Sequence, residues 1–267
     1  MGSRDHHIDG RDAEQTGGRM EPRRGTDELA HGTMASWCVP GQGPPVICVH
    51  GAGVSSKHTL PLVEALSGRL EAWAVDLPGF GASTARDHAP TVAGLAEALL
   101  EWLRARGIAR PCLLGLSLGA QVVAEAAVRA PDKVGSVVLA GPMVDPQARS
   151  LPVLAARLLL DGLREGPSVV VSGIADYRRA GALRVFRSWL ASRDHRIEQV
   201  LPEIGQPALV LRGSRDPLCP GHWAEEVARL LPRGRLVTVP GRPHVLTATA
   251  PERVADLVHD FAREVVR

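Results

Sequence analysis

LLGLSLGAQVV, residues 113–123, places a serine between two glycines where an aliphatic run ends and a helix-forming pattern begins. This is the G-x-S-x-G pattern, in which a sharp turn between a strand and a helix projects the serine hydroxyl. The glycines of the pattern leave room for the close approach of strand and helix. A turn serine without chemistry would give the same letters, so the surrounding elements must decide between the two interpretations.

Short aliphatic runs and amphipathic helical patterns alternate on both sides of this turn. One clear helical pattern covers residues 91–106, with Thr91 as its N-cap and Gly107 at its C-terminal stop. Strict alternation of strand and helix predicts an α/β fold with a mostly parallel, doubly wound sheet. The runs that predict buried strands are VICVH (46–50), EAWAVD (71–76), PCLLG (111–115), VGSVVLAG (134–141), ALVLRG (208–213) and RLVTVPG (235–241).

One long segment interrupts this alternation. Residues 146–206 contain three or four helical patterns and no convincing strand. We expect a helical cap inserted into a sheet domain that comprises residues 29–145 and 207–267. Residues 1–28 are polar, charged and glycine-containing, so they predict a disordered leader.

Composition narrows the classes of function. The 267 residues carry a formal net charge of +2 and no basic tract, which argues against nucleic acid as the main partner. No apolar run is long enough for a membrane span, and the N-terminus lacks the apolar core of a signal peptide. We therefore expect a soluble, cytoplasmic protein without a membrane partner. The 4 cysteines show no C-x-x-C spacing, which predicts free thiols.

Four segments with glycine and polar residues follow predicted strands: VHGAG (49–53), GLSLG (115–119), GSRDPL (213–218) and GRPHVL (241–246). Ligands of parallel sheets bind at the carboxyl ends of the strands, so we expect these segments to share one edge. With these motifs, residues 33–267 resemble the α/β-hydrolase superfamily, in its capped serine hydrolase subclass. The order of serine, acid and histidine along the chain is the order of that superfamily.

The resemblance implies a catalytic triad. Ser117 is the expected nucleophile, and it needs a base because a serine hydroxyl is a weak nucleophile at neutral pH. His244 is the expected base, since it directly follows a predicted strand near the C-terminus. Asp216 is the expected acid that orients the imidazole, and Asp145, which also follows a strand, stays open as the alternative.

The same resemblance implies an oxyanion hole. Its donors are expected to be the backbone N–H groups of Ala52 and Leu118. We expect His50 to anchor the loop of Ala52 through its side chain rather than to act as a second base.

The expected cap should enclose the substrate. It contains three bulky candidates for contact with an apolar acyl group, although packing of the cap on itself is the more frequent role of such residues. They are Tyr177, Phe186 and Trp189. Arginines are frequent between residues 178 and 196, and they fit a solvated helical face better than a site for an anionic substrate.

The function that follows is a serine hydrolase that cleaves a carboxylic ester or related acyl bond of a small molecule through an acyl-enzyme intermediate. We expect no cofactor and no metal. Three alternatives remain open: cleavage of C–C bonds in β-diketone-like compounds, cofactor-free haloperoxidase or perhydrolase chemistry, and ligand binding with little turnover. The fold hosts many chemistries, so it predicts neither the substrate nor the oligomeric state.

Overall fold

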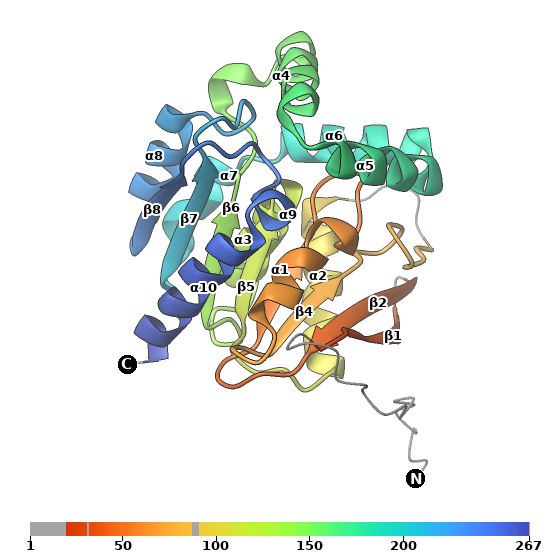
Figure 1. Cartoon of the computed structure of the whole chain (residues 1–267), viewed down its shortest axis with the longest axis vertical. Coiled ribbons are helices and arrows are strands. Elements are labelled where there is room, and N and C mark those ends of the chain that lie inside the picture. The colour runs from red at the N-terminus through yellow and green to blue at the C-terminus, as the bar shows by residue number, and fades with distance from the viewer. Residues whose placement is uncertain (1–19, 31, 87–90, 267) are drawn as a thin grey trace.

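The computed structural model describes residues 20–30, 32–86 and 91–266. Across these residues one eight-stranded sheet has the strand order β1-β2-β4-β3-β5-β6-β7-β8 (Figure 1). The pairs β1/β2 and β2/β4 are antiparallel, and every other neighbouring pair is parallel. The predicted fold class, an α/β fold with a mostly parallel sheet, is confirmed.

The central strands are buried along their whole length, because helices cover both faces of the sheet. This explains why their sequences are continuous aliphatic runs rather than alternating patterns. The strands are β1 (Arg23–Leu29), β2 (Gly32–Val39), β3 (Val46–Val49), β4 (Ala72–Val75), β5 (Cys112–Leu116), β6 (Ser136–Ala140), β7 (Ala208–Gly213) and β8 (Gly234–Val239).

Helices form one layer on each face of the sheet. On one face pack α2 (Val92–Ala105), α3 (Leu118–Arg129) and α8 (Gly221–Leu230). On the other pack α1 (Leu60–Leu66), α9 (Leu246–Thr249) and α10 (Pro251–Val266). The Thr91 hydroxyl accepts a hydrogen bond from the backbone N–H of Gly94 at 3.0 Å, so Thr91 caps α2 as predicted.

Four helices lie between β6 and β7, and we call residues 146–206 the cap segment. They are α4 (Leu151–Arg164), α5 (Pro167–Ala180), α6 (Ala182–Asp194) and α7 (Ile197–Val200). All residues from 141 to 207 are described, and none of them forms a strand. In Figure 1 α4, α5 and α6 lie at one end of the sheet, where side chains of α4, α5 and α6 share a cavity with the turn after β5.

The predicted disordered leader needs a correction. Residues 1–19 lie outside the described residues, but residues 23–29 form β1, so the prediction is wrong for 23–28. Asp27 Oδ2 accepts hydrogen bonds from Trp102 Nε1 at 2.9 Å and from Arg106 Nε at 2.7 Å. β1 is the edge strand of the sheet, and most of its residues are exposed or half-buried, so polar side chains can stay in contact with water.

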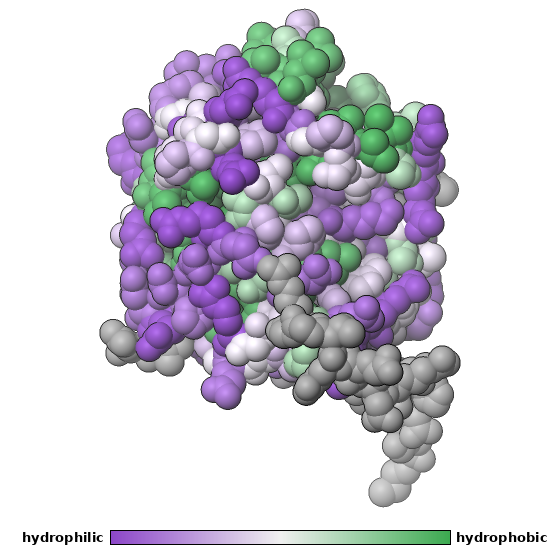
Figure 2. Space-filling model, in the orientation of Figure 1, coloured by the Kyte–Doolittle hydropathy of each residue, from purple (hydrophilic) through white to green (hydrophobic). Residues whose placement is uncertain are grey.

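Large apolar side chains are exposed mainly on α4, α5 and α6 of the cap segment. Figure 2 shows them as green surface over α4 and α5. They are Leu151, Val153, Leu159, Leu160, Leu163, Val171, Ile174, Tyr177, Leu183 and Phe186. The same helices bury two carboxylic acids, Asp161 and Asp176, so burial within them does not follow hydrophobicity. In the described part of the chain no helix is long and apolar enough to cross a membrane.

Candidate active site

Ser117 occupies a strained turn between β5 and α3. Its φ of 59° and ψ of −117° lie in a region that residues with a side chain rarely adopt. A Cβ atom on Gly115 would overlap the carbonyl group of Gly119, and a Cβ atom on Gly119 would overlap the carbonyl oxygen of Val49. The glycines of the motif therefore let strand and helix approach each other, as the sequence predicts.

Asp216 and His244 come from the loops after β7 and β8. The Nδ1 atom of His244 lies 2.8 Å from Asp216 Oδ2 and donates a hydrogen bond to it. The other carboxylate oxygen of Asp216 accepts the backbone N–H groups of Leu218 at 2.8 Å and Cys219 at 2.9 Å. These bonds fix the orientation of the carboxylate toward the imidazole.

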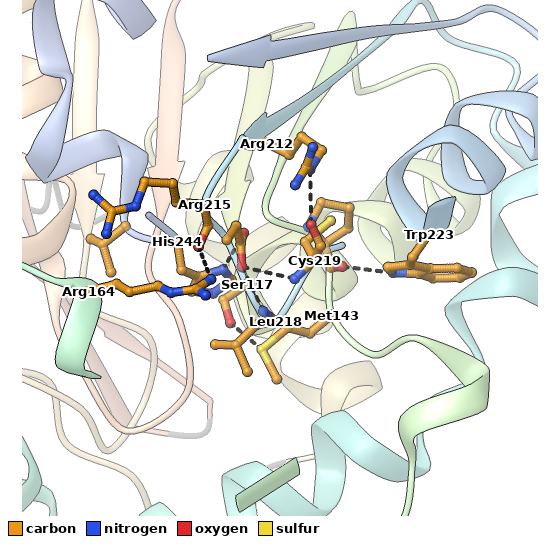
Figure 3. A network of polar contacts seen from close by, with 12 residues as sticks. Ser117, Met143, Arg164, Arg212, Arg215, Leu218, Cys219, Trp223 and His244 are labelled. Atoms are coloured by element: carbon orange, nitrogen blue, oxygen red, sulfur yellow. Dashed lines mark hydrogen bonds and ion pairs between the residues drawn. The ribbon is translucent and has the colours of Figure 1, made fainter. Parts of the chain in front are cut away.

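The serine hydroxyl lies close to this pair. It donates to Met143 Sδ at 2.8 Å, and Figure 3 shows Ser117, Met143 and His244 grouped together. The Nε2 atom of His244 is buried and has no hydrogen-bond partner among the described residues. Ser117 and His244 line the same cavity, so a free imidazole nitrogen and a serine hydroxyl share one site.

The charges of the pair reinforce each other. Burial opposes ionisation of Asp216, but the charge and hydrogen bond of His244 lower the pKa of its carboxyl below the ordinary value. Burial alone would lower the pKa of His244. The charge and hydrogen bond of Asp216 outweigh it and raise that pKa above the ordinary 6.5.

Gly141, at the end of β6, makes room for the imidazole. A Cβ atom there would lie 2.8 Å from Nδ1 and Cε1 of His244 and 3.2 Å from Asp216 Oδ2. No ring can keep its place at such a distance from an added carbon. Only a glycine at position 141 therefore leaves room for the imidazole ring where it lies.

Asp145, the alternative acid, faces other partners. Its Oδ1 atom accepts the backbone N–H of Gln147 at 2.9 Å, and its Oδ2 atom lies 3.1 Å from both Arg157 and His222. It caps the short helical turn that follows β6. Of the two acids, the structure brings only Asp216 to the imidazole of His244.

The loop after β3 lies beside the serine. Neither the Ala52 N–H nor the Leu118 N–H donates a hydrogen bond to another described residue. His50 is fully buried, donates from Nδ1 to the Gly51 carbonyl at 2.8 Å and accepts the Leu77 N–H on Nε2 at 3.0 Å. These two bonds use both ring nitrogens, so His50 anchors the loop.

A cavity of about 220 Å³ opens in front of Ser117. Tyr177 and Trp189 line it, whereas Phe186 does not and is 53% exposed. The buried face of α6 consists of Val185, Ser188 and Ser192. Phe186 follows Val185 by one residue, a turn of about 100° around the helix, so its side chain leaves this buried face. Of the three candidate pocket residues, Phe186 therefore lies outside the cavity.

Two acids that the sequence interpretation missed also line this cavity. Asp161 and Glu165 stand four residues apart on α4 and its C-cap, which places them on one helix face. Glu165 Oε1 accepts the Val245 N–H at 2.7 Å, while Asp161 Oδ1 and Glu165 Oε2 have no partner among the described residues. Burial raises the pKa of Asp161, and it raises the pKa of Glu165 to about 7. Two acids four residues apart in a largely apolar helical segment are the sequence feature that could have indicated this pair.

Metal ligation is the remaining chemistry to test at this site. The described residues contain no group of three or more His, Cys, Asp or Glu side chains placed to hold a metal ion.

Comparison with known proteins identifies the family. A model of the alpha/beta hydrolase family matches residues 46–257. The chain belongs to this family. The match covers most of the chain and includes the positions of Ser117, Asp216 and His244.

Several curated relatives of this alpha/beta hydrolase are named as esterases or hydrolases. The chain is 29% identical to a pimeloyl-(acyl-carrier protein) methyl ester esterase of Nitrosomonas europaea, over 80% of this chain and 93% of that protein. It is 30% identical to a 2-(acetamidomethylene)succinate hydrolase of Mesorhizobium japonicum, over 83% and 88%. A solved esterase from Thermogutta terrifontis matches in fold with a TM-score of 0.78 at 23% identity, covering 91% of this chain and 99% of that one.

Proposed function

We propose that this hydrolase cleaves a carboxylic ester or related acyl bond through an acyl-enzyme intermediate, with Ser117 as nucleophile, His244 as base and Asp216 as the orienting acid. The observation that carries the proposal is the arrangement of the histidine. Its Nδ1 atom is held by Asp216 at 2.8 Å, and its free Nε2 atom shares a cavity with a serine in a strained turn.

The first half-reaction forms the acyl-enzyme. The Ser117 hydroxyl turns from Met143 toward His244 Nε2, which takes its proton as Oγ bonds to the substrate carbonyl carbon. His244 then returns this proton to the oxygen of the leaving alcohol as the ester bond breaks. Asp216 stabilises the imidazolium that exists between the two transfers.

The developing negative charge needs donors. The backbone N–H groups of Ala52 and Leu118 are suited to this role, because Ala52 lines the cavity with Ser117, Leu118 directly follows Ser117, and neither N–H is used by another described residue. Their donation strengthens as the carbonyl oxygen becomes an oxyanion, so it stabilises the transition state more than the substrate.

The second half-reaction releases the acid. A water molecule attacks the acyl carbon, His244 takes one of its protons, and the carboxylic acid leaves as Ser117 recovers its proton. No cofactor enters this scheme.

Ester cleavage is favoured over the alternative chemistries by the relatives. Two of the named proteins are an esterase of methyl esters and a hydrolase. C–C bond cleavage, haloperoxidase or perhydrolase activity and ligand binding without turnover have no comparable support.

The test combines labelling with turnover. A fluorophosphonate probe should label the folded protein at Ser117 alone, and a panel of p-nitrophenyl esters, lactones and thioesters should be hydrolysed by the wild type and not by Ser117→Ala. Labelling at another serine would remove the nucleophile assignment. Binding of panel members without turnover would instead support a ligand-binding protein.

A further inference from the structure

The cavity in front of Ser117 is lined by two acids and two histidines, His58 and His244. Asp161 and Glu165 line it, and no Lys or Arg is found among its described lining residues. The remaining wall is largely aliphatic, from residues such as Val54, Leu158 and Leu218. Burial raises the pKa of both acids, and a cation brought beside them would favour their ionised form strongly, since water screens the charges poorly here.

The backbone of His244 hydrogen-bonds to the Asp161 carboxyl, but one oxygen of this carboxyl remains a buried acceptor without a donor. Asp161 is 8% exposed, and its Oδ1 atom has no hydrogen-bond partner among the described residues. The Oε2 atom of Glu165 is also buried and has no hydrogen-bond partner among the described residues. Leaving acceptors unsatisfied in a protein interior costs free energy, and the positive charge of a ligand placed beside two of them would offset part of this cost.

Aromatic side chains meet the acids at the same cavity. Tyr177 and Trp189 line it, and Tyr177 also reaches the surface at 37% exposed. Burial raises the pKa of the Tyr177 hydroxyl, and the nearby charge of Asp161 raises it further. The faces of aromatic rings attract cations, and quaternary ammonium groups are bound in proteins by such rings.

No Lys or Arg among the described lining residues pairs with the two acids inside the cavity. Arg164 is the closest arginine on α4, but it donates to the Arg215 carbonyl at 2.8 Å and does not line the cavity. Arg178 and Arg179 are exposed. Of the two lining histidines, burial lowers the pKa of His58 to about 4, and the charge of His244 is shared mainly with Asp216, which holds its Nδ1 atom.

Resting on the proposed function, we infer that this cavity selects esters that carry a cationic ammonium group, held by the carboxylates of Asp161 and Glu165 and by the aromatic faces of Tyr177 and Trp189. The same charge pattern disfavours substrates with an anionic acyl group. The substrate expected for this cavity therefore differs in charge from the succinate compound named for the relative from Mesorhizobium japonicum.

The acids could instead act only on His244. Their charges contribute to its raised pKa, and Glu165 holds the backbone N–H of Val245. Such a role would change the hydrolysis of every ester by the same factor. Selection of a cation changes the ratio between charged and uncharged esters, so the ratio separates the two roles.

The substrates are matched pairs. One pair is the p-nitrophenyl ester of γ-trimethylammoniobutyric acid and its isostere in which tert-butyl replaces trimethylammonio, which tests a cation in the acyl part. The second pair is butyrylcholine and its tert-butyl isostere, which tests a cation in the alcohol part. We expect kcat/KM to favour the cation by on the order of tenfold in at least one pair.

The variants locate the effect. Asp161→Asn and Glu165→Gln should bring this ratio close to one, whatever they do to the rate on the uncharged ester. Asp194→Asn is the control, because it removes the same charge from an exposed position on α6 outside the cavity and should keep the wild-type ratio. If one cavity variant fails to fold, the other and the wild-type ratio still decide.

Binding separates this inference from the proposed function. Choline and its tert-butyl isostere are titrated into Ser117→Ala and followed by ligand-observed NMR, with no turnover required. Preference for choline that is lost on adding Asp161→Asn supports the cation site even if no ester is hydrolysed. Equal binding of the two probes, together with a kcat/KM ratio of one in both pairs, overturns it even if uncharged esters are good substrates.

Discussion

Asp216 Oδ2 and His244 Nδ1 lie 2.8 Å apart, and both side chains are buried. The carboxylate accepts the bond, so the proton of the neutral imidazole is on Nδ1 and the lone pair is on Nε2. This is the tautomer in which the ring can take a proton from a hydroxyl. The residues are 28 positions apart in the sequence.

Asparagine at position 216 should abolish most turnover. Asp216→Asn should lower kcat by about 10,000-fold, because an amide that donates to Nδ1 imposes the wrong tautomer. Asp145→Asn should change kcat by less than about tenfold, since Asp145 contacts Arg157 and His222 rather than His244. Steady-state kinetics on one ester compare the two variants, and the reverse ranking would move the acid to position 145.

The pH profile should report the histidine. His244 acts as a base only when neutral, so kcat/KM should rise with pH through its pKa. Asp216 raises that pKa above 6.5 against the effect of burial, so the midpoint should lie above 6.5. In Asp216→Asn the largest contribution that raises this pKa is lost while burial and the charges of Asp161 and Glu165 remain, so the midpoint of the residual activity should move to lower pH. A midpoint that stays in place would show that the profile reports another group.

Alanine at position 141 should damage catalysis more than folding. The added Cβ atom would lie 2.8 Å from the His244 ring, and displacing a catalytic group by about 1 Å costs on the order of 100-fold in rate. Gly107→Ala is the matched control, because Gly107 also has a positive φ but has open space around it. Both variants should lose similar thermal stability, and only Gly141→Ala should lose kcat. Equal activity of the two would mean that the ring adapts.

Trp189 and Phe186 should differ in their effect on selectivity. Trp189 lines the cavity, so Trp189→Ala should change discrimination between short and long acyl chains by about 1–3 kcal/mol. Phe186→Ala should leave the chain-length profile unchanged, because this side chain lies outside the cavity. Relative kcat/KM values on a series of p-nitrophenyl esters measure both, and a larger effect of Phe186→Ala would contradict the position of the cavity.

Leu154 and Leu163 test how the cap segment is held. Leu154 is buried with Met143, Val144 and Leu218, so Leu154→Ala should lower the free energy of unfolding by about 2–5 kcal/mol. Leu163 is 77% exposed, and Leu163→Ala should change it by less than about 0.5 kcal/mol. Urea denaturation compares the two. Similar values would mean that the contacts of Leu154 do not stabilise the fold.

The sequence by itself determined the local elements. Thr91 caps α2, and the glycines beside Ser117 permit the turn, because hydrogen bonds to near neighbours and backbone dihedral angles depend on a few adjacent residues. Continuous aliphatic runs also determined the parallel sheet, since only strands covered on both faces bury such runs.

Tertiary structure decided which residues meet. Asp145 and Asp216 both follow strands in the sequence, and only the packing of the loops turns Asp216 toward the imidazole. The polar strand β1 is stabilised by hydrogen bonds to Asp27 from Trp102 on α2 and from Arg106 at its C-cap. No local sequence pattern predicts these contacts. Asp161 reaches the cavity because α4 lies at the end of the sheet where the turn after β5 carries Ser117. These contacts join residues far apart in the chain, so they depend on the free energy of packing the whole domain and not on any short segment.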